Sequence, residues 1–160
     1  MTISVGQQIP EANLHKVGPG GAEPVNSVDV LSKGKVVIFG VPGAFTPTCS
    51  DYHLPGFLIR AEDLRAKGVD QIVCISVNDP FVMSAWADAQ GVGEQITMLA
   101  DGSANLTQAM GLEVDLSAAG LGTRSKRFAA IIEDGTVTHL AIEPAPGLEV
   151  SSAEAVLAVL

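Results

Sequence analysis

The sequence is poor in cysteine, in aromatic residues and in positive charge. Its 160 residues include 2 Cys, and aromatic side chains make up 4% of the chain. Two cysteines are too few for the disulfide framework of a small secreted protein. Lys and Arg total 9 against 18 Asp and Glu, so the formal net charge is −9. This balance argues against nucleic acid and anionic membranes as partners, because both need a basic patch.

Long apolar runs and targeting signals are also missing. No run approaches the roughly 20 apolar residues that are needed to cross a bilayer. The first residues, MTISVGQQIPEANLHK, show no basic segment followed by an apolar one, so we expect no targeting peptide and a cytoplasmic location. In such a reducing compartment each cysteine must be a core residue, a metal ligand or a reactive thiol.

The residues that are present predict one α/β domain over residues 1–160. An apolar share of 47% is enough for one continuous core. We expect an N-terminal hairpin within residues 10–28, around the turn GPGG, and a second hairpin in RFAAIIEDGTVTHLAIE, joined by Asp134 and Gly135. Apolar, β-branched runs predict buried strands at Lys35 to Val41, Gln71 to Val77 and Ile96 to Ala100.

Helical patterns alternate with these strands. The first runs from about Thr48 to Lys67, and Pro55 is expected to kink it. The second has Asp79 as its N-cap and Pro80 at its first position, and shorter helices are predicted in SANLTQAMG and SSAEAVLAVL. This order predicts a central mixed sheet with helices on both faces, in which the first two central strands are parallel. Functional residues of such sheets gather at the carboxyl ends of the strands.

Cys49 lies at such a position, in the loop after the first central strand and at the start of a helix. A thiol there faces free backbone N–H groups and the positive end of the helix dipole, both of which favour the nucleophilic thiolate. Pro42, Gly43 and Pro47 stiffen the preceding loop, and Thr46 supplies a hydroxyl. These residues indicate a reactive cysteine.

The segment VPGAFTPTCS resembles the active-site loop of the peroxiredoxins, in the form carried by the type II group. CISVNDPFVMSAW, LADGSA and GLGTRSKRFA resemble that group too, so the similarity covers nearly the whole chain. It implies a thioredoxin-like fold and a thiol-dependent peroxidase that reduces hydrogen peroxide and alkyl hydroperoxides through a sulfenic acid on Cys49. It also implies that Pro42, Thr46 and Arg127 complete the site, and that a homodimer is regenerated by glutathione with glutaredoxin or by thioredoxin.

The chemistry of this constellation can be derived from the side chains. A thiolate that attacks a peroxide expels RO⁻, so donors must face the oxygens where charge develops. The fork of Arg127 can hold sulfur and peroxide together, while the Thr46 hydroxyl can both donate and accept. Pro42 has no N–H and would shield the sulfur from water. Arg124 is the competing arginine, but Arg127 abuts the apolar strand RFAAII, so we expect Arg124 to be a surface residue or a supporting ion pair.

His53 lies four residues after Cys49, on the same helix face. It could be the general base of a Cys/His acyl hydrolase, but the most direct interpretation is local hydrogen bonding. Zinc needs three or four protein ligands, and His15, His139 and Cys74 lie in unrelated elements, so we expect no metal and no cofactor. A thioredoxin-fold redox sensor without steady turnover is the second alternative.

Cys74 lies in the middle of QIVCISV, where burial is expected to keep the thiol inert. Some type II members resolve their sulfenic acid with a C-terminal cysteine near the stretch that here reads PGLEVSS. Val150, Ser151 and Ser152 stand there, so no internal resolving thiol is expected unless Cys74 reacts after local unfolding.

Two phenylalanines, Phe45 and Phe81, fall in loops that flank the predicted site. Large apolar side chains at such positions indicate a contact surface. The alternative is that both rings fold into the protein's own core.

Overall fold

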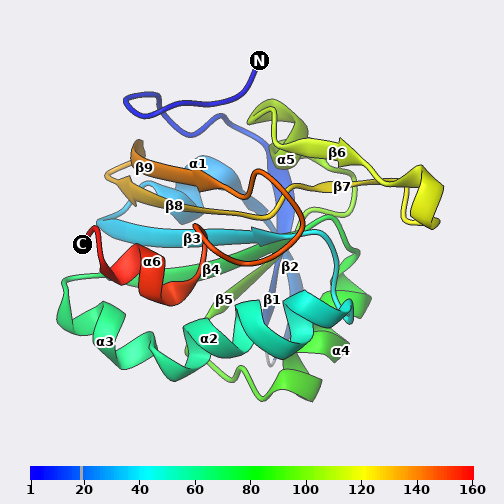
Figure 1. The fold of residues 1–160 in the computed structure, drawn as a ribbon, viewed down its shortest axis with the longest axis horizontal. Coiled ribbons are helices and arrows are strands. Elements are labelled where there is room, and N and C mark those ends of the chain that lie inside the picture. Colours follow the sequence, from blue (N-terminus) through cyan, green and yellow to red (C-terminus); the bar gives the residue numbers. More distant parts are fainter. Residues whose placement is uncertain (19) are drawn as a thin grey trace.

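A seven-stranded sheet in the order β2-β1-β5-β4-β3-β8-β9 forms the centre of the molecule (Figure 1). It is seen in a computed structural model that describes residues 1–18 and 20–160. Its strands are β1 (Asn13–Gly18), β2 (Gly21–Asn26), β3 (Lys35–Val41), β4 (Gln71–Ser76), β5 (Thr97–Ala100), β8 (Phe128–Glu133) and β9 (Thr136–Ile142).

The sheet is mixed, as the sequence predicts. β3 and β5 both run parallel to β4 in the middle, whereas β1, β2, β8 and β9 join the sheet in antiparallel pairs. Successive residues of β3 contribute to two different apolar cores, with Val37 and Phe39 in one and Val36 and Ile38 in the other. The continuous apolar run of β3 follows from this burial on both faces.

Helices cover both faces of the sheet, which confirms the predicted layering. In Figure 1, α2 (Leu54–Ile59), α3 (Ala61–Ala66), α4 (Pro80–Gln90) and α6 (Ala153–Leu157) lie below the sheet, and α1 (Ser27–Leu31) and α5 (Asn105–Ala109) lie above it. The predicted caps are present: the Asp79 carboxylate accepts from the N–H of Val82 at 2.8 Å, and Ser152 caps α6. Across the described residues, none of the helices has the length and apolar character that a membrane crossing requires.

The helical segment predicted from about Thr48 to Lys67 is present, but it is divided, and it does not break at Pro55 where the kink was expected. The segment begins with a π-helical turn, η1 (Cys49–His53), in which the N–H of Leu54 donates to the carbonyl of Cys49, and continues as α2 and α3. Pro55 lies in the first turn of α2, where its missing N–H is tolerated. The break between α2 and α3 falls instead at Arg60, which leaves helical geometry at φ −99° and ψ 11°.

Both predicted hairpins are present. β1 pairs with β2, and the GPGG turn between them includes Pro19, which lies outside the described residues. β8 and β9 are joined by Asp134 and Gly135 at φ 48° and 87°, the left-handed geometry of a two-residue hairpin turn.

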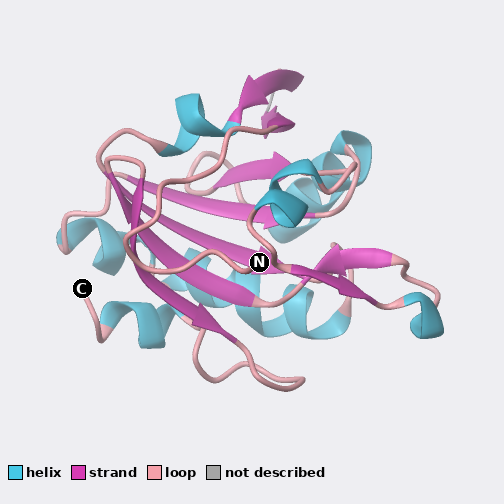
Figure 2. Cartoon of the chain, turned by 90° about the horizontal axis from the view of Figure 1, so that it is seen from above, coloured by secondary structure: helices cyan, strands magenta, loops and turns pink. Residues whose placement is uncertain are grey.

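The sequence did not predict a third hairpin, which projects from the body of the molecule in Figures 1 and 2. It consists of β6 (Glu113–Asp115), β7 (Thr123–Ser125) and the 3₁₀ turn η2 (Ser117–Ala119) between them. Strands of three residues are too short to show a hydrophobic period.

Candidate active site

The pairing of β3 with β8 brings Cys49 and Arg127 together. Cys49 follows the carboxyl end of β3, and Arg127 precedes β8, which runs antiparallel to β3 and pairs Phe128 with Gly40. Both residues therefore lie at the same edge of the sheet. Nη2 of Arg127 donates a hydrogen bond to Sγ of Cys49 over 3.1 Å, and the Cys49 side chain is fully buried.

The loop between β3 and η1 is fixed by internal hydrogen bonds. The N–H of Ala44 donates to the side-chain carbonyl of Asn78 at 2.9 Å, which ties this loop to the one after β4. The hydroxyl of Thr46 donates to the carbonyl of Gly43 at 2.6 Å. Thr46 thus lies in the same loop as Cys49 without a direct hydrogen bond to its sulfur among the described residues, and its oxygen lone pairs can accept from a further partner.

Arg124 supports this loop, but the prediction of an ion pair is wrong. Its Nε donates to the carbonyl of Leu121 at 2.8 Å, and its Nη1 lies 3.4 Å from the carbonyl of Pro42. In the part of the chain that the structure describes, Arg124 pairs with no carboxylate. Its guanidinium therefore positions Pro42, whereas that of Arg127 reaches the sulfur.

His53 makes local hydrogen bonds, as expected. Its Nδ1 lies 2.9 Å from Nη1 of Arg127, and its Nε2 lies 2.8 Å from the carbonyl of Ser151. The ring packs against Phe39 and Phe57, with centroids 4.9 Å and 5.6 Å away.

This environment keeps His53 neutral. Burial lowers the pKa of His53 to about 3, and the positive charge of Arg127 acts in the same direction, although the Ser151 carbonyl and the charge of Glu143 oppose it. A neutral ring engaged with Arg127 and Ser151 does not contact the Cys49 sulfur as a general base, which argues against the Cys/His hydrolase.

Sequence analysis did not identify Glu143 or the function of the Ser151 backbone. Oε2 of Glu143 accepts from the N–H groups of Glu149, Val150 and Ser151 at 3.0, 2.9 and 2.8 Å, and from the Ser151 hydroxyl at 2.6 Å. Partial burial opposes its ionisation, but these hydrogen bonds hold the pKa of Glu143 below its usual value. The one signal in the sequence was that Glu143 is an acidic residue at the end of a predicted strand, and this does not reveal that its carboxylate binds the backbone of residues 149–151.

Cys74 is buried in the same apolar core as Cys49, which confirms the expected burial. It pairs with Phe39 across the parallel strands β4 and β3. Burial raises the pKa of the Cys74 thiol well above its usual range, and the charge of Cys49 raises it further. Cys74 is therefore a thiol with little tendency to ionise.

A hollow of about 310 Å³ lies beside Arg127. Its walls combine apolar side chains from the β6–β7 hairpin and the loop after β9 with two cationic residues. It is lined by Pro42, Thr48, Val114, Leu116, Ser125, Lys126, Arg127, Glu143, Ala145, Pro146 and Gly147. Among residues 1–18 and 20–160, no group of three or more His, Cys, Asp or Glu side chains is arranged to hold a metal ion.

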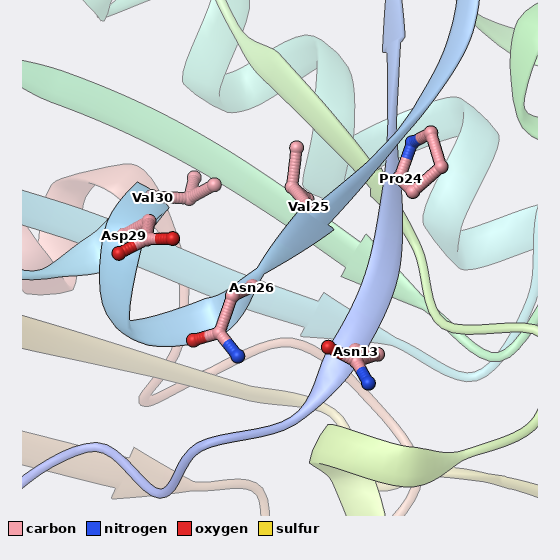
Figure 3. A pocket seen from close by; sticks show the side chains of 6 residues that line it. All are labelled: Asn13, Pro24, Val25, Asn26, Asp29 and Val30. Carbon is pink, nitrogen blue, oxygen red and sulfur yellow. The ribbon is translucent and has the colours of Figure 1, made fainter.

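Another hollow, of about 420 Å³, lies on the N-terminal hairpin and α1 (Figure 3). It is lined by Asn13, Pro24, Val25, Asn26, Asp29 and Val30. These side chains include neither a thiol nor a cation, whereas Arg127 lines the hollow of about 310 Å³.

Phe45 and Phe81 are 57% and 86% exposed, so they do not fold into the core. Phe45 lies in the loop after β3, as predicted, but the prediction of a loop at Phe81 is wrong, because this residue lies in the first turn of α4. The hydrogen bond between Ala44 and Asn78 joins the loop that carries Phe45 to the loop that precedes α4. Phe45 has φ 65°, which is rare for a bulky residue and shows that the surrounding loop determines its conformation.

Comparisons with known proteins agree with this geometry. The Redoxin family model matches residues 4–157. Peroxiredoxin-2B of Arabidopsis thaliana is 46% identical over 159 residues, which cover 99% of this chain and 98% of the relative. Peroxiredoxin-2C of Oryza sativa is 48% identical over 161 residues, again covering 99% and 98%. A crystal structure of reduced Prx3 from Vibrio vulnificus in complex with H₂O₂ superposes with a TM-score of 0.93, at 49% identity and with 99% and 96% of the two chains covered.

Proposed function

Because this chain belongs to the Redoxin family and, within it, to the type II peroxiredoxins, it is a thiol peroxidase, and we propose that Cys49 is the cysteine that reacts with the peroxide. The observation that carries this assignment is the 3.1 Å hydrogen bond from Arg127 to the Cys49 sulfur. A guanidinium stays protonated at any physiological pH, so it stabilises the thiolate. Cys74 is buried in apolar surroundings, and among the described residues no side chain donates a hydrogen bond to its sulfur.

In the proposed reaction, the Cys49 thiolate attacks one oxygen of ROOH. An S–O bond forms, the O–O bond breaks, and the departing RO⁻ takes up a proton to leave as ROH. Negative charge moves from sulfur to the departing oxygen, so the N–H groups of Arg127 stabilise the transition state. The Thr46 hydroxyl can accept from or donate to the peroxide, and Pro42 excludes water from the sulfur because it has no N–H to hydrate.

The substrates are peroxides, and the hollow beside Arg127 favours hydrogen peroxide together with small alkyl hydroperoxides. Its apolar residues Val114, Leu116 and Pro146 offer a surface for an alkyl group. Lys126 and Arg127 are on the same hollow and supply positive charge near the reacting oxygens.

Regeneration requires thiols, and we propose that they come from outside the chain. A thiol RSH attacks the Cys49 sulfenic acid to give a mixed disulfide and water, and a second thiol releases the Cys49 thiol as it forms a disulfide with the first. Cys74 is fully buried, and Ser151 and Ser152 occupy the C-terminal stretch where a resolving cysteine would stand. We propose two reducing systems: one is glutathione together with glutaredoxin, and the other is thioredoxin.

The test is peroxide consumption by the wild type, by Cys49→Ser and by the matched variant Cys74→Ser. Each is assayed with glutathione plus glutaredoxin and, separately, with thioredoxin plus its reductase. We expect no turnover in Cys49→Ser and most of the activity in Cys74→Ser. Comparable losses in two folded variants would contradict the assignment, and sulfenic acid formation without turnover under either reductant would indicate a sensor.

We also propose that the protein is a homodimer that contacts its copy through Phe45 and Phe81. The support is their exposure in the single chain, Phe45 on the loop after β3 and Phe81 in the first turn of α4, and the hydrogen bond between Ala44 and Asn78 that joins these two segments. Light scattering should show a dimer for the wild type and a monomer for Phe45→Asp/Phe81→Asp. Val5, which is also exposed, provides the control variant Val5→Asp, which should remain dimeric.

A cytoplasmic location is proposed as well. Its support is the chemistry of the thiols, because both cysteines are free and Cys49 needs a supply of reducing thiols. Cell fractionation with an antibody against the protein tests the location.

A further inference from the structure

A chain of hydrogen bonds leads away from the Cys49 sulfur to a carboxylate. Arg127 donates to Cys49 through Nη2 and contacts Nδ1 of His53 through Nη1, at 3.1 and 2.9 Å. His53 reaches the carbonyl of Ser151 through Nε2, at 2.8 Å. The N–H and hydroxyl of Ser151 both donate to Oε2 of Glu143, at 2.8 and 2.6 Å. Five residues from four segments of the chain are thus linked.

The partners of His53 determine which of its nitrogens carries the proton. A guanidinium has only donors, so Nδ1 of His53 must accept from Arg127. The ring is neutral, so its one proton is on Nε2 and is donated to the carbonyl of Ser151. The other tautomer, or a protonated ring, would direct one N–H at another across 2.9 Å. The orientation of Arg127 therefore depends on where the Ser151 carbonyl lies.

Glu143 determines where that carbonyl lies. It accepts four hydrogen bonds from residues 149–151, which fold this backbone around a single carboxylate oxygen. Its own N–H donates to the carbonyl of Arg127 at 2.9 Å. Glu143 is thus attached to Arg127 through the backbone on one side, and through Ser151 and His53 on the other.

We propose that Glu143 is a positioning residue for the peroxidase reaction: by holding the Ser151 carbonyl it selects the His53 tautomer that keeps Arg127 directed at Cys49. This inference rests on the proposed functions of Cys49 and Arg127. A hydrogen-bond donor must be held closely in place to stabilise a transition state. If the Ser151 carbonyl became mobile, His53 and then Arg127 would become mobile too, and the donor to the Cys49 sulfur would be less well positioned.

The first experiment measures the rate of Cys49 oxidation by hydrogen peroxide in Glu143→Gln, by stopped-flow fluorescence of the single tryptophan, Trp86. Gln keeps the size of the side chain but loses the charge that attracts four donors. We expect oxidation to slow about tenfold, on the scale of a small misplacement of a catalytic donor. The control is Glu149→Gln, which removes a carboxylate of the same segment that is not part of the chain of contacts and should change the rate less than about twofold.

A double-mutant cycle tests whether Glu143 acts through Arg127. If it does, Glu143→Gln should slow oxidation no further in the Arg127→Ala background. Independent, multiplying effects would overturn the inference, and so would an unchanged rate in Glu143→Gln while Arg127→Ala is slow. If Arg127→Ala itself is not slower than the wild type, the proposed function of Arg127 fails, and the inference that rests on it fails with it.

The tautomer of His53 gives a readout that a purely structural function would leave unchanged. Long-range ¹H–¹⁵N spectra of the wild type should show His53 with a protonated Nε2 and a free Nδ1, and Glu143→Gln should show a mixture of forms. A slow variant that keeps the wild-type tautomer would contradict the proposed route through His53. Should Glu143→Gln fail to fold, Ser151→Ala removes one of the four hydrogen bonds and should shift the rate and the spectrum in the same directions by less.

Discussion

Nη2 of Arg127 lies 3.1 Å from Sγ of Cys49, although 78 residues separate the two in the sequence. The sulfur is fully buried, so this donor replaces the water that would otherwise solvate a thiolate. The second terminal nitrogen of the same guanidinium is held by His53. Arg127 therefore brings a permanent positive charge to the sulfur in an orientation that the rest of the site has already fixed.

Arg127→Ala should slow formation of the Cys49 sulfenic acid about 10²-fold or more, the scale of losing one preorganised donor. Arg127→Lys should rescue poorly because an ammonium lacks the fork that serves Cys49 and His53 together. Arg124→Ala, which loses only contacts to carbonyls, should be the milder change. A larger loss in Arg124→Ala would reverse the assignment of the two arginines.

Excess peroxide without reductant should convert Cys49 to sulfinic and then sulfonic acid. No internal thiol captures the sulfenic acid, so a second peroxide reaches it first. Glutathione added beforehand should instead leave a mixed disulfide on Cys49. Intact-mass spectrometry distinguishes added oxygens and a glutathione adduct from the loss of two hydrogens. A Cys49–Cys74 disulfide formed within one turnover would contradict the proposed external reductant.

The buried His53 should make stability depend on pH. Its pKa of about 3 in the folded protein lies below the value of about 6.5 in an unfolded chain. Between these values the unfolded state binds the extra proton, so the free energy of unfolding rises with pH, by up to about 1.4 kcal/mol per pH unit, and levels off above pH 7. Urea titrations between pH 5 and 7 should show this slope in the wild type and in His15→Gln, whose histidine is exposed. A slope that persists unchanged in His53→Gln would refute this explanation.

Gly40→Ala should destabilise the protein by about 1–3 kcal/mol, the usual cost of overpacking a core. A Cβ at Gly40 would collide with the ring of Phe128, which is buried and directly follows Arg127 in the chain. We expect slower peroxide reduction as well, because a displaced Phe128 moves Arg127. Gly56→Ala is the control, since a Cβ added there would have no atom of the described residues within 4 Å, apart from its own helix and chain neighbours, and α2 should be unchanged or slightly more stable. Equal unfolding midpoints for the two variants would show that Phe128 can move aside.

Cys49, Thr46 and Pro42 could be predicted as site residues from the sequence because they are close neighbours in the chain, where spacing and chemistry are both visible. The strands β3 and β4 could also be predicted from the sequence, because a strand that is buried on both faces requires a continuous apolar run. The caps at Asp79 and Ser152 were predicted for the same reason, since a cap depends only on residues within one turn of it. Features that depend on neighbouring residues can therefore be predicted from short stretches of the sequence.

The sequence predicted neither the break at Arg60 nor the π-helical turn at Cys49. Leu54 and Phe57, which lie between the two, are fully buried beneath the sheet. Propensities of a few tenths of a kcal/mol per residue are small beside that burial. The helical segment therefore lies where the sequence predicted it, but it is divided at Arg60 and not at Pro55.

By itself the sequence determined the α/β order of elements, the position of Cys49 after the first central strand and the burial of the second thiol, because each depends on residues close together in the chain. Only the tertiary structure decided that Glu143 holds Ser151, that Ser151 orients His53, and that Arg124 supports Pro42. These contacts join segments that are separated in the sequence, and neither a hydrophobic period nor a motif indicates that they meet. They exist because β8 lies antiparallel beside β3 and β9 lies antiparallel beside β8, so the start of β8 and the end of β9 meet at the edge of the sheet where Cys49 lies.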